Sequence, residues 1–310
     1  MLQIFVIVLL IATLILILYL NYVHKYKQAL PEDYIEKTKT GGPLEQKYMH
    51  LGNFETDVFI RPEKDPLISF IAHYPKEMVE DVRYPVVLLV NSAGMSARKQ
   101  KALLAHIASW GFIAVGNDDL STADGFSAHK TVELLMKLNK ESKNVLYGHI
   151  DETRIGIMGM GQGAIGTFNA ISEYKDKYAC AIAISPIDLD IAPQVKMNYD
   201  PHKDKIPTLL LSKSEDGASS KEGLGVIYRL LRSEKILAFK PVEKQNDMLY
   251  AAMGYVIAFF LMYLRNDLEA LHVFTGDNPE LLHNACYEDA RICLDTVNEE
   301  TDEKEIDVNF

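Results

Sequence analysis

A glycine stands where the surrounding pattern would place a nucleophile. Residues 159–163 read Gly-Met-Gly-Gln-Gly, and they follow an apolar run and precede a helix-like stretch. In a G-x-S-x-G sequence of this layout, a strained strand-to-helix turn holds a serine hydroxyl above a sheet, ready to attack a carbonyl. Gly161 occupies the serine position, and residues 154–168 contain no serine or cysteine. Thr167 lies about one helical turn too late to substitute, so the sequence predicts the turn without its chemistry.

Small and polar residues follow a neighbouring apolar run and could supply a binding site beside this turn. The candidates for contact with a ligand or an anion are Asn91, Ser92, Ala93, Gly94, Met160 and Gln162. Backbone N–H groups of Ala93 and Gly94 would bind a carbonyl oxygen or an anion if they faced the turn. An ordinary strand-to-helix turn explains residues 91–94 equally well, and both interpretations stay open. Gly161 would let a ligand approach closely, although a turn that tolerates a positive φ is the simpler explanation.

Other residues that could do chemistry lack partners in the sequence. Serines at strand ends that could replace the missing nucleophile are Ser92, Ser185, Ser212 and Ser214, and none has an evident base. His106 and His129 are expected to be surface or helix residues rather than bases. Asp118 and Asp119 could form a metal-binding pair, but without a His or Cys cluster they are better explained as turn residues. No metal site and no cofactor are predicted.

Apolar runs alternate with helix-like stretches along the chain. The predicted strands are residues 58–60, 67–73, 84–90, 112–115, 154–158, 179–185, 208–212 and 236–239. The predicted helices are residues 99–109, 131–139, 164–174, 219–232 and 248–264. This alternation indicates an α/β fold with a mainly parallel central sheet flanked by helices. Residues 248–264 are apolar enough to resemble a membrane span, but Gly254 and the polar flanks favour a core helix.

The first segment has the composition of a membrane anchor. Residues 1–22 contain no charged side chain, and about 20 apolar residues match the hydrocarbon thickness of a bilayer. A cleavable signal peptide would have a basic start and small residues at a cleavage site, and neither is present. The lysines that follow place the remaining chain in the cytoplasm by the positive-inside rule; they are Lys25, Lys27, Lys37 and Lys39. We therefore expect an anchor at 1–23, a polar connector at 24–51, a domain at 52–294 and an acidic, flexible tail at 295–310.

Composition and charge narrow the class of protein. The chain has 310 residues, of which 48% are hydrophobic and 24% charged, as in ordinary globular proteins. The formal net charge is −11 and no Lys/Arg-rich block occurs, so nucleic acid is not expected as a partner. Cys180, Cys286 and Cys293 fit no common metal-binding spacing.

Several motifs together resemble the α/β-hydrolase fold, in the branch of dienelactone hydrolases, chlorophyllases and polyester hydrolases. Residues 91–94 resemble the oxyanion loop of that branch, and residues 106–119 resemble its H-L-A-S-W-G-F helix-to-strand segment. Residues 276–280 resemble its closing segment, so the likeness covers most of residues 84–295. The resemblance implies a hydrolase-like sheet and a serine, a histidine and an acid on three loops.

Of this triad, the matching positions keep only the acid. The family's elbow, G-H-S-Q-G-G, aligns with residues 159–164 and puts Gly161 at the serine. Alignment on residues 248–250 puts Gln245 at the histidine, and glutamine does not ionise near neutrality, so it cannot act as a base. Asp216 matches the acid, although an aspartate at a strand end is also a common turn or cap residue. In a triad of this type, loss of the serine or the histidine alone costs on the order of 10⁶ in kcat.

Three functions are compatible with these features. The first is a membrane-anchored α/β-hydrolase-like protein that has lost triad catalysis and binds a small apolar or acyl ligand, or a protein partner. The second is a working carboxylic-ester hydrolase with a non-standard nucleophile, and the third is a purely structural subunit that reuses the fold. The absence of both a nucleophile and a base favours the first.

Overall fold

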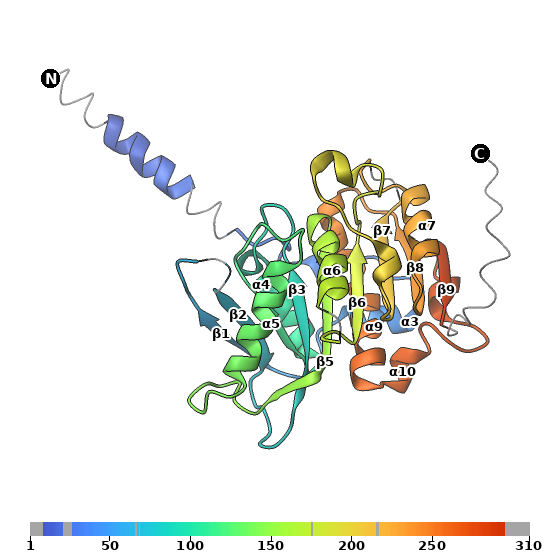
Figure 1. The fold of residues 1–310 in the computed structure, drawn as a ribbon, viewed down its shortest axis with the longest axis horizontal. Helices are drawn as coiled ribbons and strands as arrows, with labels where there is room; N and C mark the ends of the chain where they lie inside the picture. The colour runs from blue at the N-terminus through green and yellow to red at the C-terminus, as the bar shows by residue number, and fades with distance from the viewer. Residues whose placement is uncertain are drawn as a thin grey trace.

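One large sheet organises the chain in this computed structural model (Figure 1). The structure describes residues 9–20, 27–65, 67, 69–174, 176–214 and 217–294. Within these residues, nine strands pair in the order β1-β2-β4-β3-β5-β6-β7-β8-β9. The strands are β1 (Thr56–Arg61), β2 (Phe70–Pro75), β3 (Tyr84–Val90), β4 (Ile113–Gly116), β5 (Ile150–Met160), β6 (Cys180–Ile184), β7 (Thr208–Lys213), β8 (Lys235–Lys240) and β9 (Glu288–Cys293).

The centre of the sheet is parallel and its margins are antiparallel. Strands β4, β3, β5, β6, β7 and β8 run in one direction. The pairs β1–β2, β2–β4 and β8–β9 are antiparallel. Strands β3, β6 and β8 are buried along their whole length, because a parallel sheet is covered by helices on both faces. The predicted α/β fold with a mainly parallel sheet is confirmed.

Helices cover both faces of the sheet, and each face has its own apolar core. One core includes α4 (Lys101–Ser109) and α9 (Met253–Arg265), and the other includes α5 (Phe126–Leu138), α6 (Gln162–Glu173) and α7 (Lys221–Leu230). The apolar stretch predicted at 248–264 forms α8 (Met248–Ala251) and α9, with Ala252 between them. Helix α9 is buried along most of its length, so the predicted core helix is confirmed in this broken form.

The expected membrane anchor is described only in part. Residues 9–20 form an apolar helix whose side chains are exposed, and Figure 1 shows it standing apart from the sheet. In the described residues no single helix has both the length and the apolar composition to cross a bilayer, while one pair, Gln245–Ala251 with Met253–Arg265, meets that test jointly across a 51° bend. The other residues of the expected anchor, 1–8 and 21–23, and the acidic tail at 295–310 lie outside the described residues.

The segment expected to be a polar connector is instead part of the folded domain. Its described part, residues 27–51, contains two short helices, α2 (Tyr34–Lys37) and α3 (Pro43–Met49). Helix α3 packs against α9, and the buried apolar side chains of the segment are Leu30, Tyr34, Tyr48 and Met49. These side chains are spaced so widely among polar residues that no continuous apolar run marks them in the sequence.

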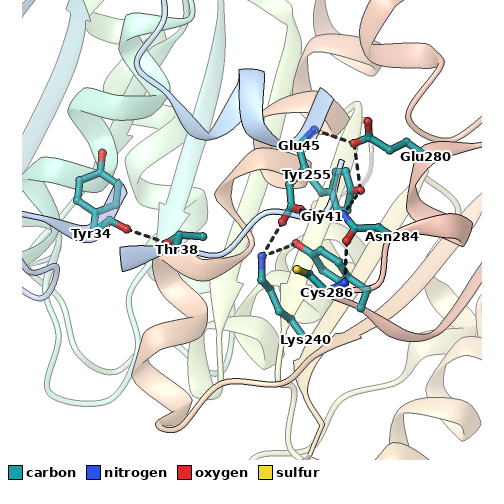
Figure 2. Close-up of polar contacts among 10 residues, drawn as sticks. Tyr34, Thr38, Gly41, Glu45, Lys240, Tyr255, Glu280, Asn284 and Cys286 are labelled. Atoms are coloured by element: carbon teal, nitrogen blue, oxygen red, sulfur yellow. Dashed lines mark hydrogen bonds and ion pairs between the residues drawn. The ribbon is translucent and has the colours of Figure 1, made fainter. Parts of the chain in front are cut away.

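A buried polar cluster holds α3 against the sheet (Figure 2). The fully buried carboxylate of Glu45 accepts hydrogen bonds from the Lys240 Nζ at 2.6 Å, the Gly41 N–H at 2.8 Å and the Asn284 Nδ2 at 2.7 Å. The carboxylate of Glu280, from the C-terminal part of the chain, accepts from the backbone N–H of Leu44 and of Glu45. Residues about 240 positions apart in sequence are therefore joined in one network.

Candidate functional site

The strand-to-helix turn lies where the glycine pattern places it. Strand β5 ends at Met160 and α6 begins at Gln162, so the whole turn is made by Gly161. Gly161 has φ 56° and ψ −117°, a conformation that side-chain-bearing residues adopt only with strain. Its N–H donates to the Ile184 carbonyl at 2.9 Å, which fixes the turn to the end of β6. A Cβ atom added to Gly161 would meet no other atom within 4 Å, so the space for a side chain is empty.

The two outer glycines are needed because backbones approach closely on either side of this turn. A Cβ on Gly159 would lie 2.2 Å from the Gly163 carbonyl oxygen, and one on Gly163 would lie 2.4 Å from the Val90 carbonyl oxygen. The start of α6 is thus pressed against β5 and against the end of β3. The sequence G-x-G-x-G therefore has two glycines required by packing and a central one whose side-chain space is free.

Residues 91–94 form the loop beside the turn, and most of their polar groups are used within the protein. The Asn91 Nδ2 donates to the carbonyl oxygens of Asn117 at 2.9 Å and Asp119 at 2.6 Å, which ties the ends of β3 and β4 together. The Ser92 hydroxyl donates to the Met160 carbonyl at 2.8 Å. These contacts use the Asn91 amide nitrogen and the Ser92 hydroxyl within the protein, while the buried Asn91 Oδ1 has no hydrogen-bond partner among the described residues.

The remaining candidates are Gln162, Met160, Ala93 and Gly94, and the side chains of the first two are also used within the protein. The Gln162 Nε2 donates to the Leu120 carbonyl at 2.8 Å, and the Met160 side chain is buried in the core. Ala93 and Gly94 are exposed, and no hydrogen bond among the described residues uses their backbone N–H groups. The groups available to a ligand next to Gly161 are therefore the backbone N–H groups of Ala93, Gly94 and Gln162, for which no acceptor is found among the described residues, and the open space above the turn.

Among the described residues no base contacts the hydroxyl of Ser92, Ser185 or Ser212. The Ser214 hydroxyl lies beside the Glu288 carboxylate, whose pKa is lowered by Lys221 and, to a smaller extent, by this hydroxyl. Ser185 and Ser212 are fully buried, and their hydroxyl oxygens lie 2.9 Å apart, while the Ser219 hydroxyl lies 3.3 Å from that of Ser212. Ser92 is committed to the Met160 carbonyl, and Ser214 is half-buried after β7. A hydroxyl without a proton acceptor is a weak nucleophile, so these contacts argue against Ser92, Ser185 and Ser212 as replacements.

The two histidines considered as bases lie in other surroundings. His106 lies in α4, in agreement with the prediction of a helix residue, but it is fully buried and not at the surface. Its Nδ1 lies 2.7 Å from the Tyr34 hydroxyl, and its Nε2 lies 3.4 Å from the Tyr48 carbonyl oxygen. Burial lowers the pKa of His106 to about 4, because the charged imidazolium would lose its hydration. His129 stacks on the Tyr174 ring at 3.8 Å between centroids and lies 3.3 Å from Glu133.

Gln245 lies at the same edge of the sheet as Gly161. Strands β5, β6, β7 and β8 are parallel and in register, so their carboxyl ends meet at one edge. Gln245 opens the short helix η4 (Gln245–Asp247), five residues after the end of β8, and is half-buried. Asp216, matched to the acid of the triad, lies outside the described residues.

The pair Asp118–Asp119 is bound into the loop after β4. Asp118 forms an ion pair with Arg98 and accepts a hydrogen bond from the Ser69 hydroxyl at 3.0 Å. Asp119 accepts from the Ser121 N–H at 3.1 Å, as in a side-chain-stabilised turn. These contacts support the interpretation as turn residues, and the described part of the chain contains no group of three or more His, Cys, Asp or Glu residues placed to hold a metal.

No protein-family model matches this chain, and none of the curated proteins matches its sequence.

Proposed function

We propose that this protein is a membrane-anchored member of the α/β-hydrolase-like class that binds a small apolar or acyl ligand at the Gly161 turn and does not hydrolyse it through a triad. The observation that carries the proposal is the conformation of Gly161. A strained backbone with no side chain, at the carboxyl end of a central parallel strand, keeps the shape of a nucleophile elbow while removing the nucleophile.

The scaffold part of the proposal is supported by the position of this turn. In an elbow of this type the backbone N–H of the residue after the nucleophile and an N–H from a nearby loop form the oxyanion hole. Here those positions correspond to Gln162, at the start of α6, and to the exposed loop with Ala93 and Gly94. Such donors bind a carbonyl or carboxylate oxygen whether or not a nucleophile is present.

The loss of catalysis is supported by the absence of two of the three groups. In a comparable triad, loss of the nucleophile or the base alone costs on the order of 10⁶ in kcat, which corresponds to about 8 kcal/mol of transition-state stabilisation. Gly161 offers no nucleophile, and Gln245 offers no base. The remaining oxygen-binding groups would stabilise a bound ligand without turning it over.

Anchoring is supported by the helix at residues 9–20. Its exposed side chains are almost all large and apolar, and in water such a surface is costly. A bilayer removes that cost, and the lysines that follow favour a cytoplasmic domain.

Native mass spectrometry tests the binding role. The chain from residue 27 onward is purified without detergent, and we expect a small apolar ligand to co-purify. Ala93→Trp places a bulky side chain on the exposed loop beside Gly161 and should abolish this ligand. Val145→Trp, at an exposed position between α5 and β5, is the matched control and should retain it. A ligand-free wild type, or equal ligand content in both variants, would refute the binding site.

A further inference from the structure

The folded domain is attached to its apolar N-terminal helix at the edge of the sheet that carries Gly161. The Ala29 N–H donates to the Lys99 carbonyl at 2.7 Å. The Gln28 side chain donates to the Arg98 carbonyl at 3.2 Å and accepts from the Lys101 N–H at 3.3 Å. These partners lie in the segment between the end of β3 and the start of α4, directly after the loop of Ala93 and Gly94.

The chain between the helix and this attachment is short. Eight residue steps separate Leu20, the last described helical residue, from Gln28, and eight residues reach at most about 28 Å when fully extended. A tether of this length, fixed at the carboxyl edge, keeps that edge within about 28 Å of the end of the helix.

Exposed apolar side chains lie on the same edge. Leu120 is 45% exposed in the loop after β4, and its carbonyl accepts a hydrogen bond from Gln162, next to Gly161. Phe126, at the start of α5, is 41% exposed, and Val195, in the loop after β6, is 48% exposed.

These two loops are joined to each other. The Asn169 Nδ2 donates to the Ala123 carbonyl at 2.6 Å and to the Asn198 carbonyl at 2.9 Å, so the loops after β4 and β6 meet over α6. Leu120, Phe126 and Val195 therefore lie in or next to two loops that meet beside α6, the helix that starts at the Gly161 turn, and we call these three residues the elbow rim.

We propose that the elbow rim faces a phospholipid bilayer, so that a ligand reaches the Gly161 turn from the lipid phase. This inference rests on the anchoring in the proposed function and adds the direction from which the ligand comes. The bilayer is the occupant of the rim because the tether holds the rim within reach of the membrane-bound helix, and because burying exposed Leu, Phe and Val side chains in lipid is favourable.

Site-specific fluorescence tests the orientation in the full chain. In a background of Cys286→Ser and Cys293→Ser, the fully buried Cys180 remains and should resist labelling. Leu120→Cys and, independently, Val195→Cys place a polarity-sensitive NBD label on the elbow rim. Val145→Cys places the same label in the loop before β5. Val145 is 42% exposed, a fraction close to the 45% of Leu120, so it is the matched control.

The labelled proteins are reconstituted into dioleoylphosphatidylcholine vesicles with and without doxyl-labelled lipid. We expect lipid-borne doxyl to quench the label at positions 120 and 195 at least two-fold more than the label at 145. Equal quenching at all three positions, or stronger quenching at 145, in protein that floats with the vesicles would overturn the orientation while leaving the anchor intact. Protein that fails to float with the vesicles would overturn the anchoring itself, and the orientation with it.

Discussion

The Nζ atom of Lys240 lies 2.6 Å from the Glu45 Oε1, and both side chains are buried, with exposures of 4% and 0%. Lys240 ends β8 and Glu45 belongs to α3, so the ion pair fastens the N-terminal segment to the sheet (Figure 2). Lys240→Met would leave the Glu45 carboxylate buried without its counter-charge. We expect the free energy of unfolding to fall by about 3–5 kcal/mol, measured by urea denaturation.

Lys47, which lies in α3 together with Glu45, supplies the control for the Lys240→Met substitution. Lys47 pairs with Glu269, but both side chains of this pair are about half exposed. Lys47→Met should therefore change the free energy of unfolding by no more than about 1 kcal/mol. Equal effects of Lys240→Met and Lys47→Met would show that the buried pair does not hold α3 in place.

The N-terminal boundary of the folded domain is the subject of a second prediction. A chain that begins at residue 52 lacks Glu45 and the buried side chains of Tyr34, Tyr48 and Met49, so it exposes apolar core and leaves Lys240 unpaired. We expect this chain to aggregate or to lack a cooperative thermal transition, whereas a chain that begins at residue 27 should unfold cooperatively. A cooperative transition of similar midpoint in both chains would contradict the docking of residues 27–51.

The three glycines of the elbow should differ sharply when each is replaced by alanine. Gly159→Ala and Gly163→Ala put a Cβ atom within 2.4 Å of a backbone carbonyl oxygen, and backbone cannot move aside cheaply. We expect each to destabilise the protein by at least about 3 kcal/mol. Gly161→Ala places its Cβ within 4 Å of no other atom and should cost only the backbone strain, about 1–3 kcal/mol. Chemical denaturation of the three variants measures the order, and a larger loss for Gly161→Ala would be inconsistent with the geometry of the turn.

His106 makes stability depend on pH in a defined window. Burial lowers the pKa of His106 to about 4 from an ordinary value of 6.5, so between these values the unfolded chain binds a proton that the folded one does not. Stability is therefore fully present above pH 6.5 and is lost as the pH falls towards 4, by about 3 kcal/mol.

A neutral replacement isolates this contribution. His106→Asn keeps an acceptor for the Tyr34 hydroxyl but has no titratable group. The free energy of unfolding of the variant should fall less steeply between pH 6.5 and 4 than that of the wild type. Since His73, whose pKa burial also lowers to about 4, is unchanged in both proteins, parallel curves would mean that His106 is not held neutral in the fold.

The sequence predicts best the elements whose pattern depends on burial alone. Strand β3 has the bounds predicted for it, because a parallel strand covered on both faces is a continuous run of Val and Leu. Strand β9 was not predicted, because Glu288, Asp289 and Arg291 give this exposed edge the composition of a loop. The break at Ala252 between α8 and α9 likewise has no mark in the sequence.

For the candidate site, the glycine spacing predicts the turn. It does not predict the hydrogen bonds of the neighbouring side chains, because their partners lie far along the chain. Asn91 and Gln162 are predicted to contact a ligand, but the side-chain amide nitrogen of each donates a hydrogen bond to a backbone carbonyl of the loop after β4. The pair Glu45–Lys240 spans 195 residues, and each member has the appearance of an ordinary surface charge in the sequence. Only the folded chain shows that both are buried.

Labelling with a fluorophosphonate tests the loss of the nucleophile most directly. Such a probe forms a covalent bond to an activated serine, and intact-mass spectrometry counts the adduct. We expect no adduct on the wild-type chain and no turnover of short p-nitrophenyl esters, whereas Gly161→Ser combined with Gln245→His should gain measurable labelling and esterase activity. A stoichiometric adduct on the wild-type chain, mapped to Ser92, Ser185, Ser212 or Ser214, would contradict the proposal that this protein binds its ligand without attacking it.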